Sequence, residues 1–265
     1  MKQLCCALLY LVFSLLPIFT DHAQAFDQPD LGELAESPPC SAICQIATRY
    51  NHINTLIRDG KISRTLAQSE VKRLLAEVRA EYYRLVGTNL PREKWVFPLA
   101  NYDRRAITGG RNKGYIARGY DFFDGNRHGG HPAFDIFIHD RDQDNRDDRT
   151  GKEVQVLSLT RGIVVALERE WEPGSALKGG KYIWVYDPEN DLLVYYAHNA
   201  ELLVVLGEVV SPGDPLATVG RTGFNAAKHR SPTHLHLSVL KVRDGRPQPM
   251  NVYPDLVRAR TVSAE

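Results

Sequence analysis

Two short segments that are far apart in the chain carry the side-chain types that bind zinc: HPAFD at residues 131–135 and HLH at residues 234–236. Because side chains of a strand alternate between two faces, His234 and His236 project to one face, and the leucines beside them point into a core. His131 and Asp135 are also an even number of residues apart. A helix would place them on one face as well, but Pro132 and the run Phe134-Asp135-Ile136-Phe137-Ile138 favour an extended path. The pattern predicts three imidazole and carboxylate ligands with a fourth position left to water, the arrangement of a catalytic zinc site.

A third segment, YAHN at residues 196–199, completes the constellation. Val194, Tyr196 and His198 are two residues apart, so a regular strand would place all three on one face. We therefore expect His198 to emerge at the end of a strand and to reach the metal cleft.

The motifs HPAFD, YAHN and THLH occur in this order, with Gly220-Arg221-Thr222-Gly223 ahead of the last. In this respect the chain resembles the LytM/lysostaphin-type zinc endopeptidases, peptidase family M23, from about Phe97 to Leu256. The resemblance implies one zinc ion per chain, with His131, Asp135 and His236 as its ligands and His198 and His234 as the catalytic histidines that do not bind the metal.

The chain departs from the family pattern beside each motif. The position two residues after His131, usually Gly in the family, is Ala133, and the residue after His198 is Asn199 instead of the frequent Leu. Leu237-Ser238 replaces a common Phe-Glu pair. None of these changes removes a predicted ligand or catalytic histidine, so they bear on the details of the groove.

The chemistry expected of such a site is peptide-bond hydrolysis without a covalent intermediate. Zinc lowers the pKa of a bound water to about 7 and polarises the scissile carbonyl. The sequence has no H-E-x-x-H motif that would supply a glutamate base. A neutral His198 or His234 must then orient or deprotonate the water and, once protonated, stabilise the oxyanion or protonate the amine.

These features predict a zinc metalloendopeptidase that acts on peptidoglycan stem peptides or cross-links. The resemblance points to bonds between small residues, and we favour D-Ala–diaminopimelate cross-links over oligoglycine bridges. Two alternatives stay open: a non-catalytic LytM-type module that binds and activates another cell-wall hydrolase, and a zinc carboxypeptidase or amidase acting on related bonds. The retained ligand set argues against the first alternative.

The N-terminus has the pattern of an export signal. Lys2 precedes an apolar run from Leu4 to Phe19, and Ala23-Gln24-Ala25 offers small residues at the cleavage positions, so residues 1–25 are predicted to be a signal peptide cleaved after Ala25. An uncleaved membrane anchor is the alternative. A periplasmic or secreted location follows, and in an oxidising compartment Cys40 and Cys44 could form a local disulfide or stay as free thiols.

Composition excludes other classes of protein. The chain has 265 residues and a formal net charge of +1, which argues against a nucleic-acid binder that neutralises phosphates. After the N-terminus, no apolar run approaches the roughly 18 residues of a membrane span. We expect no nucleic-acid partner and no membrane span after signal cleavage.

Residues 26–39 are polar and contain prolines, as in a linker, and residues 40–90 have helical periodicity. The apolar residues recur every three or four positions from Ile43 to Ile57 and again from Val71 to Leu85, with Asp59-Gly60 and Gly87 as stop signals. These runs predict an αα-hairpin. It could simply pack on the catalytic domain, or act as a docking arm or an inhibitory propeptide.

From Trp95 the pattern changes to short β-type runs separated by Gly, Pro, Asn and Asp, so residues 95–256 are predicted to form a mostly β, antiparallel LytM-like domain. The predicted strands are Val154–Leu159, Gly162–Leu167, Tyr182–Tyr186, Leu192–Ala197, Leu216–Val219 and His234–Leu240. The turn at residues 187–190 is expected to join two of them as a hairpin.

Several other residues could do chemistry but have simpler explanations. Five aspartates between Asp140 and Asp148 resemble a calcium loop but lack its Gly and Glu and alternate with arginines, so a solvated charged loop is favoured. Gly129-Gly130 suggests close backbone approach. Three histidines lack partners at ligand spacing, namely His128, His139 and His229. Three tyrosines could line a groove or simply pack in the interior, namely Tyr102, Tyr115 and Tyr120.

Overall fold

A computed structural model describes residues 40–88, 90, 93–108 and 114–263. Cys40–Glu265 form one compact unit. The predicted signal peptide (1–25) and linker (26–39) lie outside the described residues, so these two expectations stay predictions.

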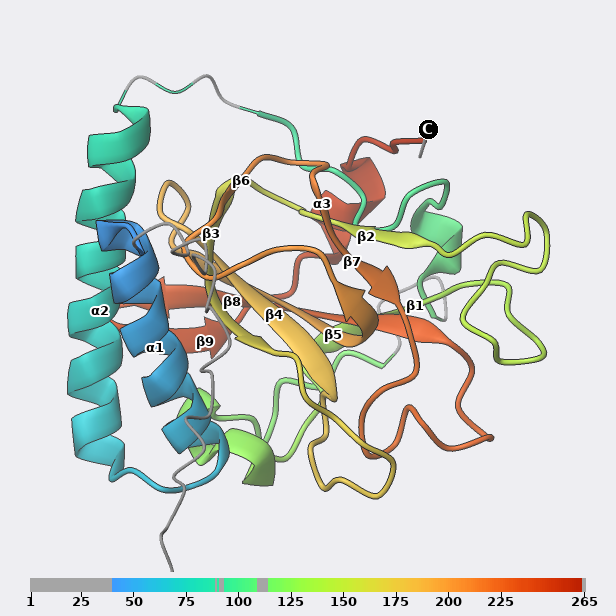
Figure 1. Cartoon of the computed structure of the whole chain (residues 1–265), viewed down its shortest axis with the longest axis horizontal. Helices are drawn as coiled ribbons and strands as arrows, with labels where there is room; N and C mark the ends of the chain where they lie inside the picture. Colours follow the sequence, from blue (N-terminus) through green and yellow to red (C-terminus); the bar gives the residue numbers. More distant parts are fainter. Residues whose placement is uncertain (1–39, 89, 91–92, 109–113, 264–265) are drawn as a thin grey trace, which may run out of the picture. The chain divides into compact units, whose positions relative to one another are not determined.

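Two long helices precede a set of strands and short helices (Figure 1). The helices of the described part are α1 (Ala42–Arg58), α2 (Arg64–Val86) and α3 (Tyr253–Arg258), with 3₁₀ helices η1 (Arg104–Ala106) and η2 (Phe122–Arg127). The strands are β1 (Ala133–Phe137), β2 (Gln155–Leu157), β3 (Gly162–Glu168), β4 (Lys181–Asp187), β5 (Leu192–Leu202), β6 (Val209–Val210), β7 (Pro215–Val219), β8 (His234–Arg243) and β9 (Arg246–Pro249).

The strands of the described chain form one sheet with the main order β1-β8-β5-β4-β3-β6. Strand β7 pairs with β2 and β5, and β9 pairs with β8. Every one of these strand pairs is antiparallel. The predicted mostly β, antiparallel fold preceded by helices is confirmed.

The two long helices end where the sequence signals predicted, while α2 begins seven residues before the first predicted apolar position, Val71. Ser41 and Ser63 cap their N-termini by accepting hydrogen bonds from the backbone N–H groups of Cys44 and Leu66. Helix α1 ends before Asp59, and α2 ends at Gly87, whose φ of 80° suits a residue without a Cβ. Cys40 and Cys44 form a disulfide at the start of α1.

The sheet separates two hydrophobic cores because its side chains alternate. One core contains Val194, Tyr196, Leu235 and Leu237 together with the loops and α3. The other is formed by the buried faces of α1 and α2 packed on β3, β4, β5 and β8, as seen where the two helices run beside the sheet in Figure 1. The hairpin thus covers part of one face of the sheet. Leu85, at the end of the predicted apolar stripe, is instead exposed.

Each of the six predicted strands corresponds to an observed strand, but some of their ends were wrong. Strand β5 continues through the YAHN motif to Leu202 instead of ending before His198, and β8 continues to Arg243. The short strands β6 and β9 and helix α3 were not predicted, because two to six residues give too little periodicity. Within the described chain, none of the helices has both the length and the apolar character needed to cross a membrane.

The packing of α2 on the sheet leads to a prediction about stability. Leu74 of α2 is fully buried, whereas Leu66 of the same helix is 52% exposed. Leu74→Ala should lower the free energy of unfolding by about 2–5 kcal/mol, since it leaves a cavity between the helix and the sheet. Leu66→Ala should change it by less than about 0.5 kcal/mol. Denaturant unfolding measures both, and equal effects would contradict the packing described here.

Candidate metal centre

The pairing of β1 with β8 brings the two predicted metal-binding segments together. Asp135 lies directly opposite His236, and Phe137 lies opposite His234. Directly opposed residues of an antiparallel pair share a face, so Asp135 and both histidines project to the same side. Leu235 and Leu237 are fully buried on the other side, as predicted.

His131 precedes β1 and is held by the backbone on both sides. Its N–H and C=O exchange hydrogen bonds of 2.7 Å with Ile116. Its Nδ1 lies 2.8 Å from the carbonyl oxygen of Gly114, so Nδ1 carries the hydrogen and Nε2 keeps its lone pair. At Gly130, where φ is 70°, an added Cβ would lie 2.7 Å from the carbonyl oxygen of Arg118. The predicted close backbone approach is confirmed at this glycine.

The side chains of His131, Asp135 and His236 converge on one point. One donor atom from each lies within 4.8 Å of the others. Nε2 of His131 is 3.3 Å and Nδ1 of His236 is 3.2 Å from Oδ1 of Asp135. Ligand atoms about 2.0–2.1 Å from a tetrahedral zinc would be about 3.3–3.4 Å apart, so these two separations match the edges of such a site.

The carboxylate also fits the role of a ligand. Oδ1 of Asp135 is buried and accepts no hydrogen bond. Burial raises the pKa of Asp135, but the imidazoles of His131 and His236 outweigh this effect and hold the pKa well below its usual range. Burial lowers the pKa of His236, which favours the neutral imidazole that a metal requires. The three residues therefore fit a zinc ion in donor type, charge and spacing.

His198 reaches the same point by a backbone conformation that strand alternation does not provide. Its φ is 69°, in the left-handed region. Tyr196 stays in the core, where its hydroxyl accepts a hydrogen bond from the N–H of Leu159, while the ring of His198 lies 5.0 Å from that of His234 and 5.4 Å from that of His236. The expectation that Tyr196 and His198 share a face is therefore wrong, because the left-handed residue reverses the alternation.

The two histidines predicted to be catalytic have the same hydrogen-bonding arrangement. Nδ1 of His198 lies 2.8 Å from the carbonyl oxygen of Thr222, and Nδ1 of His234 lies 2.7 Å from that of Pro232. These contacts assign the hydrogen to Nδ1 and leave each Nε2 as a proton acceptor. Nε2 of His234 is 3.7 Å from Oδ1 of Asp135. Burial has the largest effect on the pKa of His198 and lowers it well below its usual value. The neighbouring His236 and His234 lower this pKa further.

A group of polar residues that sequence reasoning did not assign fixes the segment before His234. The hydroxyl of Thr233 donates a 2.6 Å hydrogen bond to Asp140, and the guanidinium of Arg221 contacts the same hydroxyl at 3.2 Å. Arg221 also donates to the carbonyl oxygens of Ser231 and Lys228. Thr233 stands directly before the HLH motif, and this adjacency is the only signal in the sequence that could have identified it.

The acidic loop is only partly solvated, which corrects the sequence interpretation for two of its residues. Asp140 and Asp147 are buried. The carboxylate of Asp140 accepts hydrogen bonds from the N–H groups of Asp144 and Asn145 as well as from Thr233, so it closes the loop on itself. Oxygens of Asp140, Asp142 and Asp148 do lie within 4.8 Å of one another.

The remaining aromatic and imidazole residues have packing partners. Tyr102 stacks on His139 and hydrogen-bonds Asp147, and Tyr115 stacks on Phe134. Tyr120 packs on His128 next to the metal centre, whereas His229 is exposed and its carbonyl oxygen accepts a hydrogen bond from Gln143.

Two hollows lie near the centre. A small pocket of about 110 Å³ has His131 and His236 among its lining residues. A larger, open hollow of about 800 Å³ is lined by Phe137 and Pro232, which neighbour His234, but by none of the five site residues.

The model of peptidase family M23 matches residues 147–251 of this chain, so the resemblance inferred from the motifs is confirmed over that segment. The matched segment contains His198, His234 and His236, while His131 and Asp135 precede it. No curated protein matches the chain.

Solved structures with similarity to the chain include three peptidases. A putative glycyl-glycine endopeptidase LytM from Ruminococcus gnavus is 20% identical, with 86% of this chain and 95% of that chain covered and a TM-score of 0.44. A zinc-containing peptidase from Vibrio cholerae is 19% identical (60% and 40% covered, TM-score 0.38). The antimicrobial peptidase lysostaphin from Staphylococcus simulans is 21% identical (49% and 44% covered, TM-score 0.34). This chain therefore spans less than half the length of the last two.

The close approach of Gly223 to His198 leads to a prediction that has a matched control. Gly223 (φ 114°) and Gly174 (φ 94°) both have positive φ, but a Cβ at Gly223 would lie 2.5 Å from the carbonyl oxygen of Lys178 and 2.8 Å from Nδ1 of His198, whereas at Gly174 it meets nothing within 4 Å. Gly174→Ala should cost about 1–2 kcal/mol of stability, from backbone strain alone. Gly223→Ala should cost clearly more and shift the imidazole NMR signals of His198. Unchanged His198 signals in a folded Gly223→Ala protein would contradict the geometry.

Proposed function

We propose that this protein is a zinc metallopeptidase that hydrolyses peptide bonds in bacterial peptidoglycan. The observation that carries the proposal is the convergence of His131, Asp135 and His236 on one point, with the Nε2 atoms of His198 and His234 left as proton acceptors beside it. The match to peptidase family M23 supports the reaction class.

In this proposal His131, Asp135 and His236 hold one zinc ion. A zinc ion held there would supply Lewis acidity, which polarises a scissile carbonyl and lowers the pKa of water. The Asp135 carboxylate reduces the net positive charge of the centre compared with a set of three histidines. The hydrogen bond from His131 to Gly114 fixes the orientation of the first ligand.

His198 and His234 handle protons. Each donates its Nδ1 hydrogen to a backbone carbonyl and presents Nε2 toward the centre, so each is able to accept a proton from water and return it to the leaving amine. Their rings lie 5.0 Å apart, which leaves room for one to serve the attacking water and the other the tetrahedral intermediate. As imidazolium, either would stabilise the oxyanion.

The substrate proposal combines the site with the N-terminal sequence. An export signal at residues 1–25 would deliver the mature protein to the periplasm or outside the cell, where peptidoglycan is an accessible peptide polymer. Residues 95–256 form the proposed catalytic domain, and residues 40–90 form the hairpin beside it. The proposed substrate is an extended stem peptide with small residues that would lie beside the small pocket lined by His131 and His236.

The metal assignment is tested by metal content. His131→Ala, Asp135→Ala and His236→Ala should each lose most of the one zinc ion per chain, because each removes one of three protein ligands. His198→Ala and His234→Ala should retain it, as should the control His229→Ala, whose side chain is exposed. Elemental analysis of the purified proteins measures this. Full zinc occupancy in all three ligand variants would refute the assignment.

Catalysis is tested on purified cell-wall sacculi. The zinc-loaded mature protein should release fragments that mass analysis identifies by the bond cut, and a chelator should stop the release until zinc is restored. His198→Ala and His234→Ala should reduce turnover by about 10²–10⁴-fold, the usual contribution of a general acid or base. If zinc-loaded wild-type protein binds sacculi but cuts no bond, the protein is a binding module that acts through another hydrolase.

A further inference from the structure

The small pocket beside the candidate metal centre is lined in part by the helical hairpin. His131 and His236 are among its lining residues, and so are Asn54, Ile57 and Arg58 of α1. Its volume of about 110 Å³ suits one small residue or a few water molecules, since a water occupies about 30 Å³. A chain entering from the centre therefore has room for about one residue on this side.

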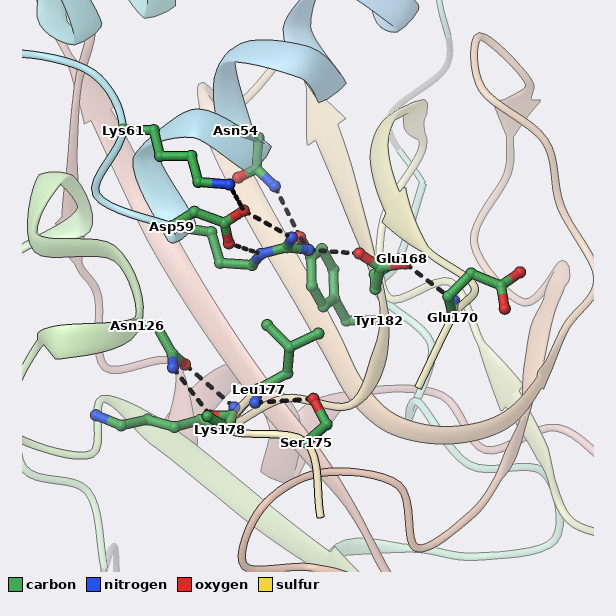
Figure 2. A network of polar contacts seen from close by, with 12 residues as sticks. Asn54, Asp59, Lys61, Asn126, Glu168, Glu170, Ser175, Leu177, Lys178 and Tyr182 are labelled. Carbon is green, nitrogen blue, oxygen red and sulfur yellow. Dashed lines mark hydrogen bonds and ion pairs between the residues drawn. The ribbon is translucent and has the colours of Figure 1, made fainter. Parts of the chain in front are cut away.

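The positive charge that α1 contributes to the pocket, that of Arg58, is already neutralised. The guanidinium of Arg58 is paired with Asp59 and Glu168 and also contacts the hydroxyl of Tyr182. Asn54 donates a 3.1 Å hydrogen bond to the same hydroxyl. Figure 2 shows Asn54, Asp59, Glu168 and Tyr182 gathered in this network. Because these groups satisfy one another, Arg58 has little charge left to offer a ligand.

Lys178 also lines the pocket, but unlike Arg58 it has no acidic partner among the described residues. Its ammonium donates a 2.8 Å hydrogen bond to the carbonyl oxygen of His128, three residues before His131, and no carboxylate pairs with it among the described residues. An ammonium has three donors, so two remain. Asn126 fixes the backbone here by accepting a hydrogen bond from the N–H of Lys178 and donating one to Ala176 (Figure 2).

The pocket lining contains one cation that no acid balances. No Asp or Glu is among the described residues that line it, and because Arg58 is already paired with Asp59 and Glu168, the unpaired cation is Lys178. Aromatic side chains, among them Trp184 and Tyr195, also line the pocket, while Lys178 itself is exposed to solvent. A small anionic group within one residue of the metal centre is the ligand that matches this lining.

We propose that the pocket is a substrate subsite in which Lys178 binds a free carboxylate on the carbon bonded to the scissile nitrogen. This inference rests on the proposed peptidase function and narrows its substrate class. Such a carboxylate has two sources in cell-wall peptides: a diaminopimelate residue in a cross-link, or the C-terminal residue of an uncross-linked peptide. An oligoglycine bridge offers none next to an internal bond.

The test compares substrates that differ only in that carboxylate. Cross-linked muropeptide dimers are prepared with the diaminopimelate carboxylate next to the scissile amide either free or amidated, alongside a stem peptide ending in D-Ala-D-Ala and pentaglycine. Wild-type protein should prefer the free acid. Lys178→Met should raise KM for it about tenfold, the range of a charged hydrogen bond, and leave kcat unchanged. The amidated dimer should be unaffected, and Lys178→Arg should restore much of the preference.

Lys241→Met is the matched control. The Lys241 ammonium also donates to a backbone carbonyl, that of Asn190 at 2.7 Å, but lines a different pocket. It should leave every KM unchanged. Carboxylate-dependent cleavage of the dimer supports the cross-link source, and release of D-Ala supports the C-terminal source. An equal rate on free and amidated dimers, or pentaglycine cleavage that Lys178→Met does not alter, would overturn the subsite.

A binding measurement separates failure of the subsite from failure of the proposed function. Metal-free protein is titrated with meso-diaminopimelate and with its diamide, and binding is followed by NMR. The acid should bind more tightly than the diamide to wild-type protein and equally weakly to Lys178→Met. If no substrate is cleaved but this difference persists, the peptidase proposal fails and the carboxylate site stands. No difference in wild-type protein overturns the site.

Discussion

The register between β1 and β8 is the constraint on which the candidate centre depends. It places Asp135 opposite His236, so that a carboxylate and an imidazole meet across one strand pair. A slip of one residue would turn Asp135 to the opposite face and expose the neighbouring apolar side chains. Burial of Leu235 and Leu237 opposes such a slip, because both are fully enclosed by the core on the other face. The hydrophobic core thus determines the positions of the polar atoms.

The other part of the centre depends on backbone strain. His198 adopts a left-handed conformation that costs of the order of 1–3 kcal/mol for a residue with a Cβ. Surrounding contacts hold it there: its N–H donates to Gly179, its Nδ1 donates to Thr222, and Thr222 donates its hydroxyl to Asn199. Gly223 fits closely against the imidazole. The glycine-rich turn ahead of the HLH motif therefore positions a histidine that lies on another strand.

Sequence patterns predicted what depends on local periodicity. Even spacing within HPAFD and HLH predicted the shared face. The three-and-four spacing of apolar residues predicted both long helices, and the stop signals predicted their C-terminal ends. Alternation failed at His198, because its left-handed conformation is imposed by tertiary hydrogen bonds. The buried state of Asp140 was also unpredictable, since charge suggests solvent and its partner Thr233 is distant in the sequence. The roles of the five site residues came from family resemblance and stay a proposal.

The hairpin and the metal centre share one face of the sheet, and this has a consequence for the groove. The ring of Phe122 contacts Trp184, Trp184 packs on Tyr195 at 4.4 Å, and Tyr195 reaches the ring of His236 at 6.1 Å. These aromatic contacts lead from the core covered by the helices to the centre. Because close-packed interiors yield little to local displacement, the position of α1 fixes the depth of the pocket beside His236. In the proposed enzyme the hairpin is then a wall of the substrate site, and its packing on the sheet determines how much of a peptide the site accepts on that side.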